Sequence, residues 1–374
     1  MNPIGLSYVN AGVVHGVDGS VSARDYFHAP ARRVDFMQAS VSQMLRGGVR
    51  LAVVSHGLND PDLLPGPAGV EYILRCFDAI VSEAEACDQC VLVRTQRDLR
   101  RARRAGKLAV VLHLTGCPVN GSFQVLDVLA RLGVRACHPM HHDAAIGEHW
   151  YGQGRGLTRY GKQLVREMEA RHILVDTAHA SDRSFRDILR TARRPIFDSH
   201  TGCRAIVPSD RNRTDAQMKA IAATGGVVGV HFGSQLLADG LAVQPRRRLI
   251  EERNRLIARF RRTHRDPYDV LHHAYDARRW SRAIGGAKDD GHEAARATLE
   301  QLCDHIERMI EIAGIDHVCI GSDYALGGIC AGVETAAKLQ NLARALARRG
   351  YRSAELGKVL LGNLERLILC SLPR

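Results

Sequence analysis

Short apolar runs recur along the chain, and each is bounded by glycine or polar residues. The runs are rich in β-branched residues and stay apolar at successive positions rather than alternating with polar ones. This pattern indicates strands that are buried on both faces of a parallel sheet. We predict eight such strands, at 12–18, 49–55, 107–114, 133–139, 172–178, 194–199, 226–232 and 317–323.

Helical patterns separate most of these strands. Apolar residues recur at helical spacing in 34–47, 67–87, 122–132, 158–171, 181–192, 214–224 and 294–313. Regular alternation of strand and helix predicts an α/β fold of the (β/α)₈ TIM-barrel type rather than an open doubly wound sheet. No GxGxxG motif follows the first strand, which argues against a dinucleotide-binding fold. We treat residues 1–374 as one barrel domain with an insertion at about 234–293, between the seventh and eighth strands.

Composition narrows the class of protein. The chain has no apolar run long enough for a transmembrane helix and no secretory signal pattern, so we expect a cytoplasmic protein without a membrane partner. The net charge of +12 comes largely from arginine. Basic residues alternate with acidic and apolar ones at helical spacing, and aromatic residues make up only 5% of the chain. This favours a solvated basic surface over a nucleic-acid site.

Residues with metal-binding or acid–base chemistry end several predicted strands. His179 and His200 stand in VDTAHAS and IFDSHTG, and Asp323 stands in CIGSDYALGG. A TIM barrel gathers the carboxyl ends of its strands at one face, so these side chains should converge. Imidazoles placed there suit a divalent metal such as zinc, and a neighbouring aspartate can accept a proton from water. More histidines fall near the same face: His113, His138, His141, His142 and His231.

Longer stretches of the chain resemble the membrane (renal) dipeptidase family, peptidase family M19. The similar segments are VDTAHASDRSFRDIL, RRPIFDSHTGCRAIVPSDRNRTD, GIDHVCIGSDYALGG, which resembles the family's GIDHVGIGSDFDG, and LLGNLERL, which resembles its GGNFLRV. The similarity spans most of the chain outside 234–293. It implies a barrel metallopeptidase that cleaves dipeptides at a two-zinc site and forms a homodimer.

Carried over residue by residue, the resemblance predicts an altered metal site. The family's DGHND motif supplies a histidine and an aspartate to the first zinc, and those positions hold Ser20 and Ser22 here. The family's bridging glutamate falls at Thr115. The two histidines of the second zinc match His179 and His200. Because hydroxyl groups are poor zinc ligands, a two-zinc mechanism is not expected.

The substrate side of the family's site is better preserved. The substrate-facing histidine of the family matches His141, and its substrate-binding arginine matches Arg211 in SDRNR. The first aspartate of GSDFDG matches Asp323, whereas the second is replaced by Ala325. The sequence therefore keeps groups that could bind and activate an amino-acid-derived substrate.

Three states of the site stay open. In the first, His179 and His200 bind one divalent metal such as zinc, and Asp323, His113 or His231 supplies a further ligand. His113 is a candidate because it lies on the same strand face as Thr115. In the second, the same pocket carries out acid–base chemistry without a metal. In the third, the chain is an inactive binding or scaffold protein on the same barrel.

The first state is our preferred hypothesis. It describes a divergent dipeptidase-like hydrolase that acts on a dipeptide or an amidated amino-acid-derived small molecule. His179 and His200 bind the metal, Asp323 and His141 are catalytic, and Arg211 holds the substrate together with His141. The expected partners are a small-molecule substrate and a second copy of the chain.

Overall fold

The computed structural model gives the structure of most of the chain. It describes residues 2–10, 27–28, 38–57, 66–117, 119, 121–141, 145–150, 154–241, 262, 295–324 and 328–374. The greater part of the expected insertion at 234–293 therefore lies outside the described residues.

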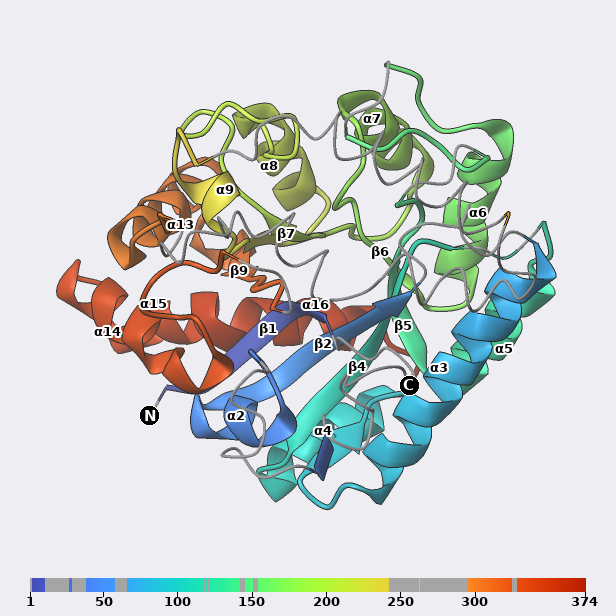
Figure 1. Ribbon diagram of the computed structural model, residues 1–374, viewed down its shortest axis with the longest axis horizontal. Coiled ribbons are helices and arrows are strands. Elements are labelled where there is room, and N and C mark those ends of the chain that lie inside the picture. The colour runs from blue at the N-terminus through green and yellow to red at the C-terminus, as the bar shows by residue number, and fades with distance from the viewer. Residues whose placement is uncertain are drawn as a thin grey trace.

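Eight parallel strands form a barrel at the centre of the molecule, ringed by helices (Figure 1). Their hydrogen-bonded order is β6-β5-β4-β2-β1-β9-β8-β7, and a parallel bridge between Asp176 and Phe197 joins the two ends of this order. The barrel confirms the predicted fold class. Its strands are β1 (Ile4–Asn10), β2 (Val49–Gly57), β4 (Leu108–Thr115), β5 (Val134–His138), β6 (Leu174–Val175), β7 (Asp198–Thr201), β8 (Val228–Val230) and β9 (Val318–Ile320).

The beginning of the chain differs from the predicted pattern. The segment expected as the first strand, 12–18, lies outside the described residues, and the strand between β2 and β9 is β1. A further short strand, β3 (Cys90–Leu92), pairs with β4 outside the barrel order. Its apolar run is too short to separate from the end of the preceding helix by pattern alone.

Helices follow most of the strands and begin at side chains that cap their first turn. Thr95, Thr158, Ser181, Thr214 and Thr298 each accept a hydrogen bond from a backbone N–H of the helix that follows. The helices are α2 (Val41–Arg46), α3 (Pro67–Ala86), α4 (Gln96–Ala105), α5 (Gln124–Leu132), α6 (Arg159–Ala170), α7 (Asp182–Thr191), α8 (Asp215–Ala223), α9 (Ser234–Leu237), α13 (Leu299–Ala313), α14 (Gln340–Arg348), α15 (Ser353–Gly357) and α16 (Asn363–Ser371). The described residues also form three short helical turns: η2 (Ile315–His317), η3 (Ala336–Lys338) and η4 (Lys358–Gly362).

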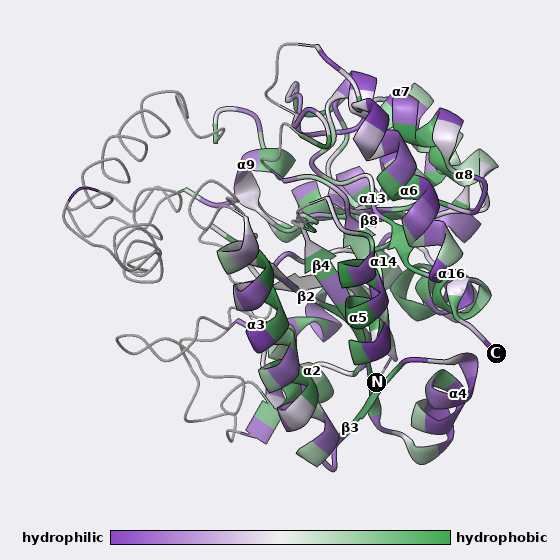
Figure 2. Ribbon diagram, turned by 90° about the vertical axis from the view of Figure 1, so that its right-hand side faces the viewer, coloured by the Kyte–Doolittle hydropathy of each residue, from purple (hydrophilic) through white to green (hydrophobic). Residues whose placement is uncertain are grey.

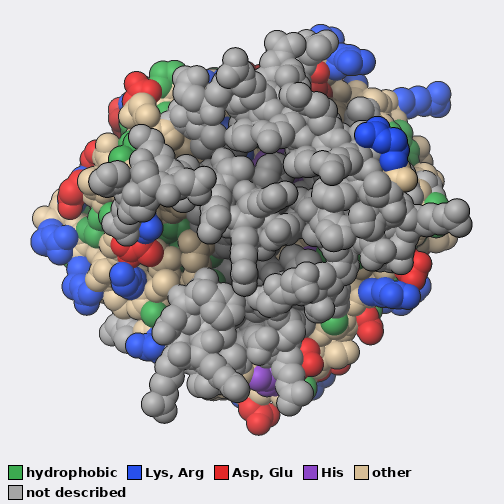
Figure 3. Space-filling view, viewed as in Figure 1, with side chains coloured by type: hydrophobic (Ala, Val, Ile, Leu, Met, Phe, Trp, Pro, Cys, Tyr) green, Lys and Arg blue, Asp and Glu red, His purple; other side chains and the backbone are tan. Residues whose placement is uncertain are grey.

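Hydropathy follows this architecture. The central strands are largely apolar, and the surrounding helices alternate between hydrophobic and hydrophilic residues (Figure 2). On the face shown in Figure 3, the described Lys and Arg side chains lie round the edge and are interspersed with Asp and Glu. None of the described helices combines the length and the apolar character that spanning a bilayer requires.

One face of the strands changes from apolar to polar along the barrel. Leu51 of β2 lies beside Ala109 of β4 in an apolar cluster that includes residues of α16. Because successive side chains of a strand point to opposite faces, the residues four positions further along each strand lie on the same face as Leu51 and Ala109. There Ser55 lies beside His113, and both side chains are fully buried. The fold thus builds a polar layer toward the carboxyl ends of the strands, where TIM barrels carry their active sites.

Candidate active site

His179 and His200 bring two ring nitrogens together beside β6 and β7. His179 lies in the turn before α7, and its φ of 68° is a left-handed conformation, whereas His200 lies within β7. Their Nε2 atoms are 3.1 Å apart. Burial, reinforced by the positive charge of Arg211, lowers the pKa of both imidazoles well below the usual range. Both rings are therefore neutral, which is the form that binds metal.

The outer nitrogens of the two rings also have partners. Nδ1 of His179 is 3.1 Å from Nε2 of His149, and Nδ1 of His200 is 2.6 Å from Oγ of Ser199. If each Nδ1–H donates to its partner, both Nε2 atoms present a lone pair to the same point. Tetrahedral zinc with bonds of about 2.0–2.1 Å places two ligand nitrogens roughly 3.3 Å apart, so the observed separation suits zinc.

Asp323 stands beside this pair. It follows β9 with a φ of 50°, and its Oδ2 is 3.9 Å from Nε2 of His200 and 2.9 Å from Nε2 of His231. Nδ1 of His231 accepts the backbone N–H of Gly233, so the proton of this ring is on Nε2 and is donated to Asp323. His231 thereby orients the carboxylate. A left-handed backbone at two non-glycine site residues, Asp323 and His179, is strain of the kind found at functional sites.

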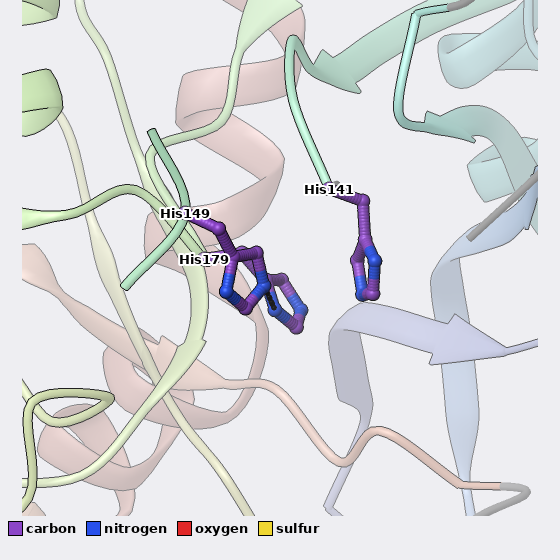
Figure 4. A group of neighbouring side chains, drawn as sticks. All are labelled: His141, His149 and His179. Carbon is purple, nitrogen blue, oxygen red and sulfur yellow. Dashed lines mark hydrogen bonds between the residues drawn. The ribbon is translucent and has the colours of Figure 1, made fainter. Parts of the chain in front are cut away.

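His141 and His149 complete a group of three histidines with His179 (Figure 4). One nitrogen from each ring lies within 4.8 Å of the others, and the ring centroids of His141 and His179 are 4.4 Å apart. Figure 4 shows His149 and His179 side by side, with His141 facing them from a separate segment. An isolated antiparallel bridge between His149 and Ala180 brings this loop to the site. His149 could not be predicted from sequence because it follows no predicted strand and belongs to no recognised motif.

A second set of polar side chains is fully enclosed by the barrel. Nε2 of His113 is 3.1 Å from Oδ2 of Asp176, and Nδ1 of His138 is 3.7 Å from the same oxygen. Nδ1 of His113 is 2.8 Å from Oγ of Ser55, which is 2.6 Å from Oγ1 of Thr115. The structure therefore places His113 against Asp176 rather than beside the His179–His200 pair.

The two arginines of the SDRNR segment have different surroundings. Nε of Arg213 is 2.6 Å from Oδ2 of Asp198, and its Nη1 donates to the carbonyl oxygen of Ala180. Arg211 donates from Nη2 to the carbonyl oxygen of His200 at 2.8 Å. Among the described residues its buried Nη1 has no hydrogen-bond partner. Burial lowers the pKa of Arg211 to about 10, so the guanidinium stays charged near neutral pH.

Four predicted positions lie outside the described residues: Ser20, Ser22, His142 and Ala325. The expected loss of ligands at the first two therefore stays a prediction. Thr115 is described, and its hydroxyl is engaged with Ser55.

Comparisons with known proteins identify the family and agree with the fold. A family model described as membrane dipeptidase (peptidase family M19) matches residues 17–369. An uncharacterized protein in the pqqA 5′ region of Klebsiella pneumoniae is 26% identical over 294 residues, which cover 76% of this chain and 90% of that protein.

Solved structures share the barrel. The dipeptidase AC, a metallopeptidase of family M19, superposes with a TM-score of 0.75 at 19% identity, covering 100% of this chain and 99% of its own. A metallopeptidase from Rhodobacter sphaeroides, solved with a phosphinate mimic of the dipeptide L-Ala-D-Ala, superposes with a TM-score of 0.69 at 19% identity. That match covers 98% of this chain and 99% of the other.

Proposed function

Because this chain belongs to the membrane dipeptidase family (peptidase family M19), a family of metal-dependent hydrolases, we propose that it hydrolyses a dipeptide or an amidated amino-acid derivative. The observation that carries the proposal is the convergence of His179, His200 and Asp323 at the carboxyl ends of three strands. The Rhodobacter sphaeroides structure with a dipeptide mimic supports the substrate class.

One zinc ion held by His179 and His200 is the proposed cofactor, with Asp323 within reach as a third donor. Neutral imidazoles, Nε2 atoms 3.1 Å apart and hydrogen-bonded Nδ1 atoms fit such an ion. When bound, zinc polarises a carbonyl group and lowers the pKa of water. The hydroxyl of Thr115 is engaged with Ser55, which supports one metal at this position rather than the two of the family.

Substrate recognition is assigned to Arg211 and His141. The guanidinium of Arg211 is charged and buried, and one of its two donor edges is engaged by the carbonyl oxygen of His200. Nη1 is then available to a substrate carboxylate, for which a guanidinium is well shaped. His141 lies across from His179 and can donate a hydrogen bond to the oxygen that gains charge during hydrolysis.

Asp323 is the proposed general base. The hydrogen bond from His231 fixes the orientation of its carboxylate, which can accept a proton from attacking water and return it to the leaving amine. Neutral His200, 3.9 Å away, does not compete for that proton because its own pKa is depressed by burial.

The test is a hydrolysis screen over free and C-terminally amidated dipeptides, with zinc content measured by elemental mass spectrometry. The His179→Ala/His200→Ala variant should lose turnover and the zinc equivalent held by this pair, whereas His317→Ala, a histidine outside the site, should lose neither. Unchanged turnover in the double variant would refute the zinc proposal. Turnover that survives complete removal of metal would favour acid–base chemistry without a metal. No turnover of any compound, together with no bound metal, would favour an inactive binding protein.

A further inference from the structure

We propose that His113, His138 and Asp176 form a separate site for a divalent transition metal such as zinc, deeper in the barrel than the His179–His200 pair. This inference goes beyond the proposed function because it uses none of the donors assigned there. It would give the chain a second metal position built from residues that differ from the family's own ligands.

The three side chains meet at one carboxylate oxygen. Oδ2 of Asp176 is 3.1 Å from Nε2 of His113 and 3.7 Å from Nδ1 of His138. The donor atoms all lie within 4.8 Å of one another, and the two ring centroids are 4.9 Å apart. Donor atoms around a tetrahedral zinc ion are roughly 3.3 Å apart, so small movements of the side chains are enough to bind one.

Other contacts hold these donors in place. Oδ1 of Asp176 accepts the backbone N–H groups of Ala178 and Ser199 at 2.9 and 3.0 Å, which turns Oδ2 toward the two rings. Nδ1 of His113 pairs with the hydroxyl of Ser55, so Nε2 faces Asp176. An outer partner on the second nitrogen of a histidine and on the second oxygen of a carboxylate is typical of metal sites.

The electrostatics of the set also suit a cation. All three side chains are 0% exposed, and burial lowers the pKa of His113 to about 4, which keeps its ring neutral. Asp176 is then a buried negative charge hydrogen-bonded to neutral groups, and a divalent ion would compensate it. Two imidazoles and one carboxylate form the donor set that zinc, iron(II) and related ions take in proteins.

The position also accounts for histidines that the resemblance leaves unexplained. His113 lies two residues before Thr115, which replaces the family's bridging glutamate, and His138 lies three residues before His141. The ring of His138 is 5.0 Å from that of His179, so the new set adjoins the first one. The set therefore supplies new donors beside Thr115, the position of the family's bridging glutamate, which is in register with His138.

Zinc binding to the full-length chain tests the inference. Protein stripped with a chelator is titrated with zinc, and wild type should bind about two equivalents per chain. The His113→Asn/His138→Gln variant and the His179→Ala/His200→Ala variant should each keep about one equivalent. His317→Ala serves as the control for removing an unrelated imidazole and should match wild type.

Equal zinc stoichiometry in wild type and in folded His113→Asn/His138→Gln protein would overturn the second site. If that variant does not fold, as judged by circular dichroism, anomalous diffraction from zinc-loaded wild-type crystals decides. A zinc peak between the three side chains supports the inference, and its absence refutes it. Failure of the proposed function is a different result, namely no zinc on His179 and His200 and no turnover, whatever happens at the deeper set.

Discussion

Replacing Arg213 by methionine should lower the free energy of unfolding by about 3–5 kcal/mol, the usual cost of removing one partner from a buried ion pair. The Arg213 side chain is 1% exposed, and Asp198, its partner at 2.6 Å, is fully buried. Methionine fills much of the volume but leaves the carboxylate without its cation. Arg213 also donates to carbonyl oxygens of Thr177 and Ala180, which flank His179, so zinc affinity should fall as well.

The loss can be measured as a shift in Tm of metal-stripped, full-length protein by calorimetry. An unfolding entropy of about 2.1 cal/mol/K per residue gives roughly 0.8 kcal/mol/K for 374 residues. The predicted loss then corresponds to a drop of about 4–6 °C. Arg204→Met is the matched control, because Arg204 pairs at 2.8 Å with Asp182, whose side chain is 51% exposed. Its cost should stay below about 1 kcal/mol.

A drop in Tm for Arg213→Met no larger than that for Arg204→Met would refute the reasoning from burial. A second variant separates lost charge compensation from lost packing. In Arg213→Met/Asp198→Leu both charges are removed, and most of the lost stability should return. If the double variant is as unstable as the single one, packing and the lost carbonyl contacts carry the cost instead.

Three further predictions follow from the site and the core. His231→Leu should lower kcat/KM about 10–100-fold with an unchanged circular dichroism spectrum, because Asp323 loses the donor that orients it. His231→Gln keeps a donor and should recover part of that loss. Equal rates for the two variants would contradict the orienting role of His231. Arg211→Met should raise KM for a free dipeptide but not for its C-terminal amide, and an equal rise for both would rule out carboxylate binding. Burial lowers the pKa of His305 to about 4. Between pH 6.5 and about 4 the unfolded chain therefore binds a proton on this imidazole that the folded chain does not bind. The contribution of the neutral His305 ring to the free energy of unfolding is complete above pH 6.5 and falls by about 3 kcal/mol as the pH drops to 4. The stability of His305→Gln, measured by urea denaturation, should depend less steeply on pH, and an unchanged slope would exclude this histidine as the cause.

Much of the barrel could be predicted because its strands are buried on both faces. The predicted strand 107–114 became β4, Leu108–Thr115, since every residue of that run is apolar or enclosed. The strand Ile4–Asn10 was not predicted because polar residues interrupt its apolar pattern, whereas the predicted run 12–18, which lies outside the described residues, is richer in valine. Local pattern could not decide between the two because pairing with β2 and β9 is a long-range contact.

The candidate site was predictable where a strand end carries it. His179, His200 and Asp323 follow that rule, and the structure brings them together. His149 reaches the site because its loop forms an isolated β-bridge with Ala180, which no local sequence pattern predicts. Asp176 falls inside a predicted strand, and only the closure of the barrel shows that its carboxylate faces two histidines from other strands.

The short seam between β6 and β7 would give the proposed metal centre a mechanical role. β6 has two residues, and the seam is closed by the bridge from Asp176 to Phe197 and its backbone hydrogen bonds. His179 follows β6 and His200 lies in β7, so an ion bound to both would link the two strands across the seam. Part of the binding free energy would then go into keeping the barrel shut, and amide exchange at Phe197 should slow when zinc is added. In such an enzyme the supply of metal would determine how firmly the barrel is held closed.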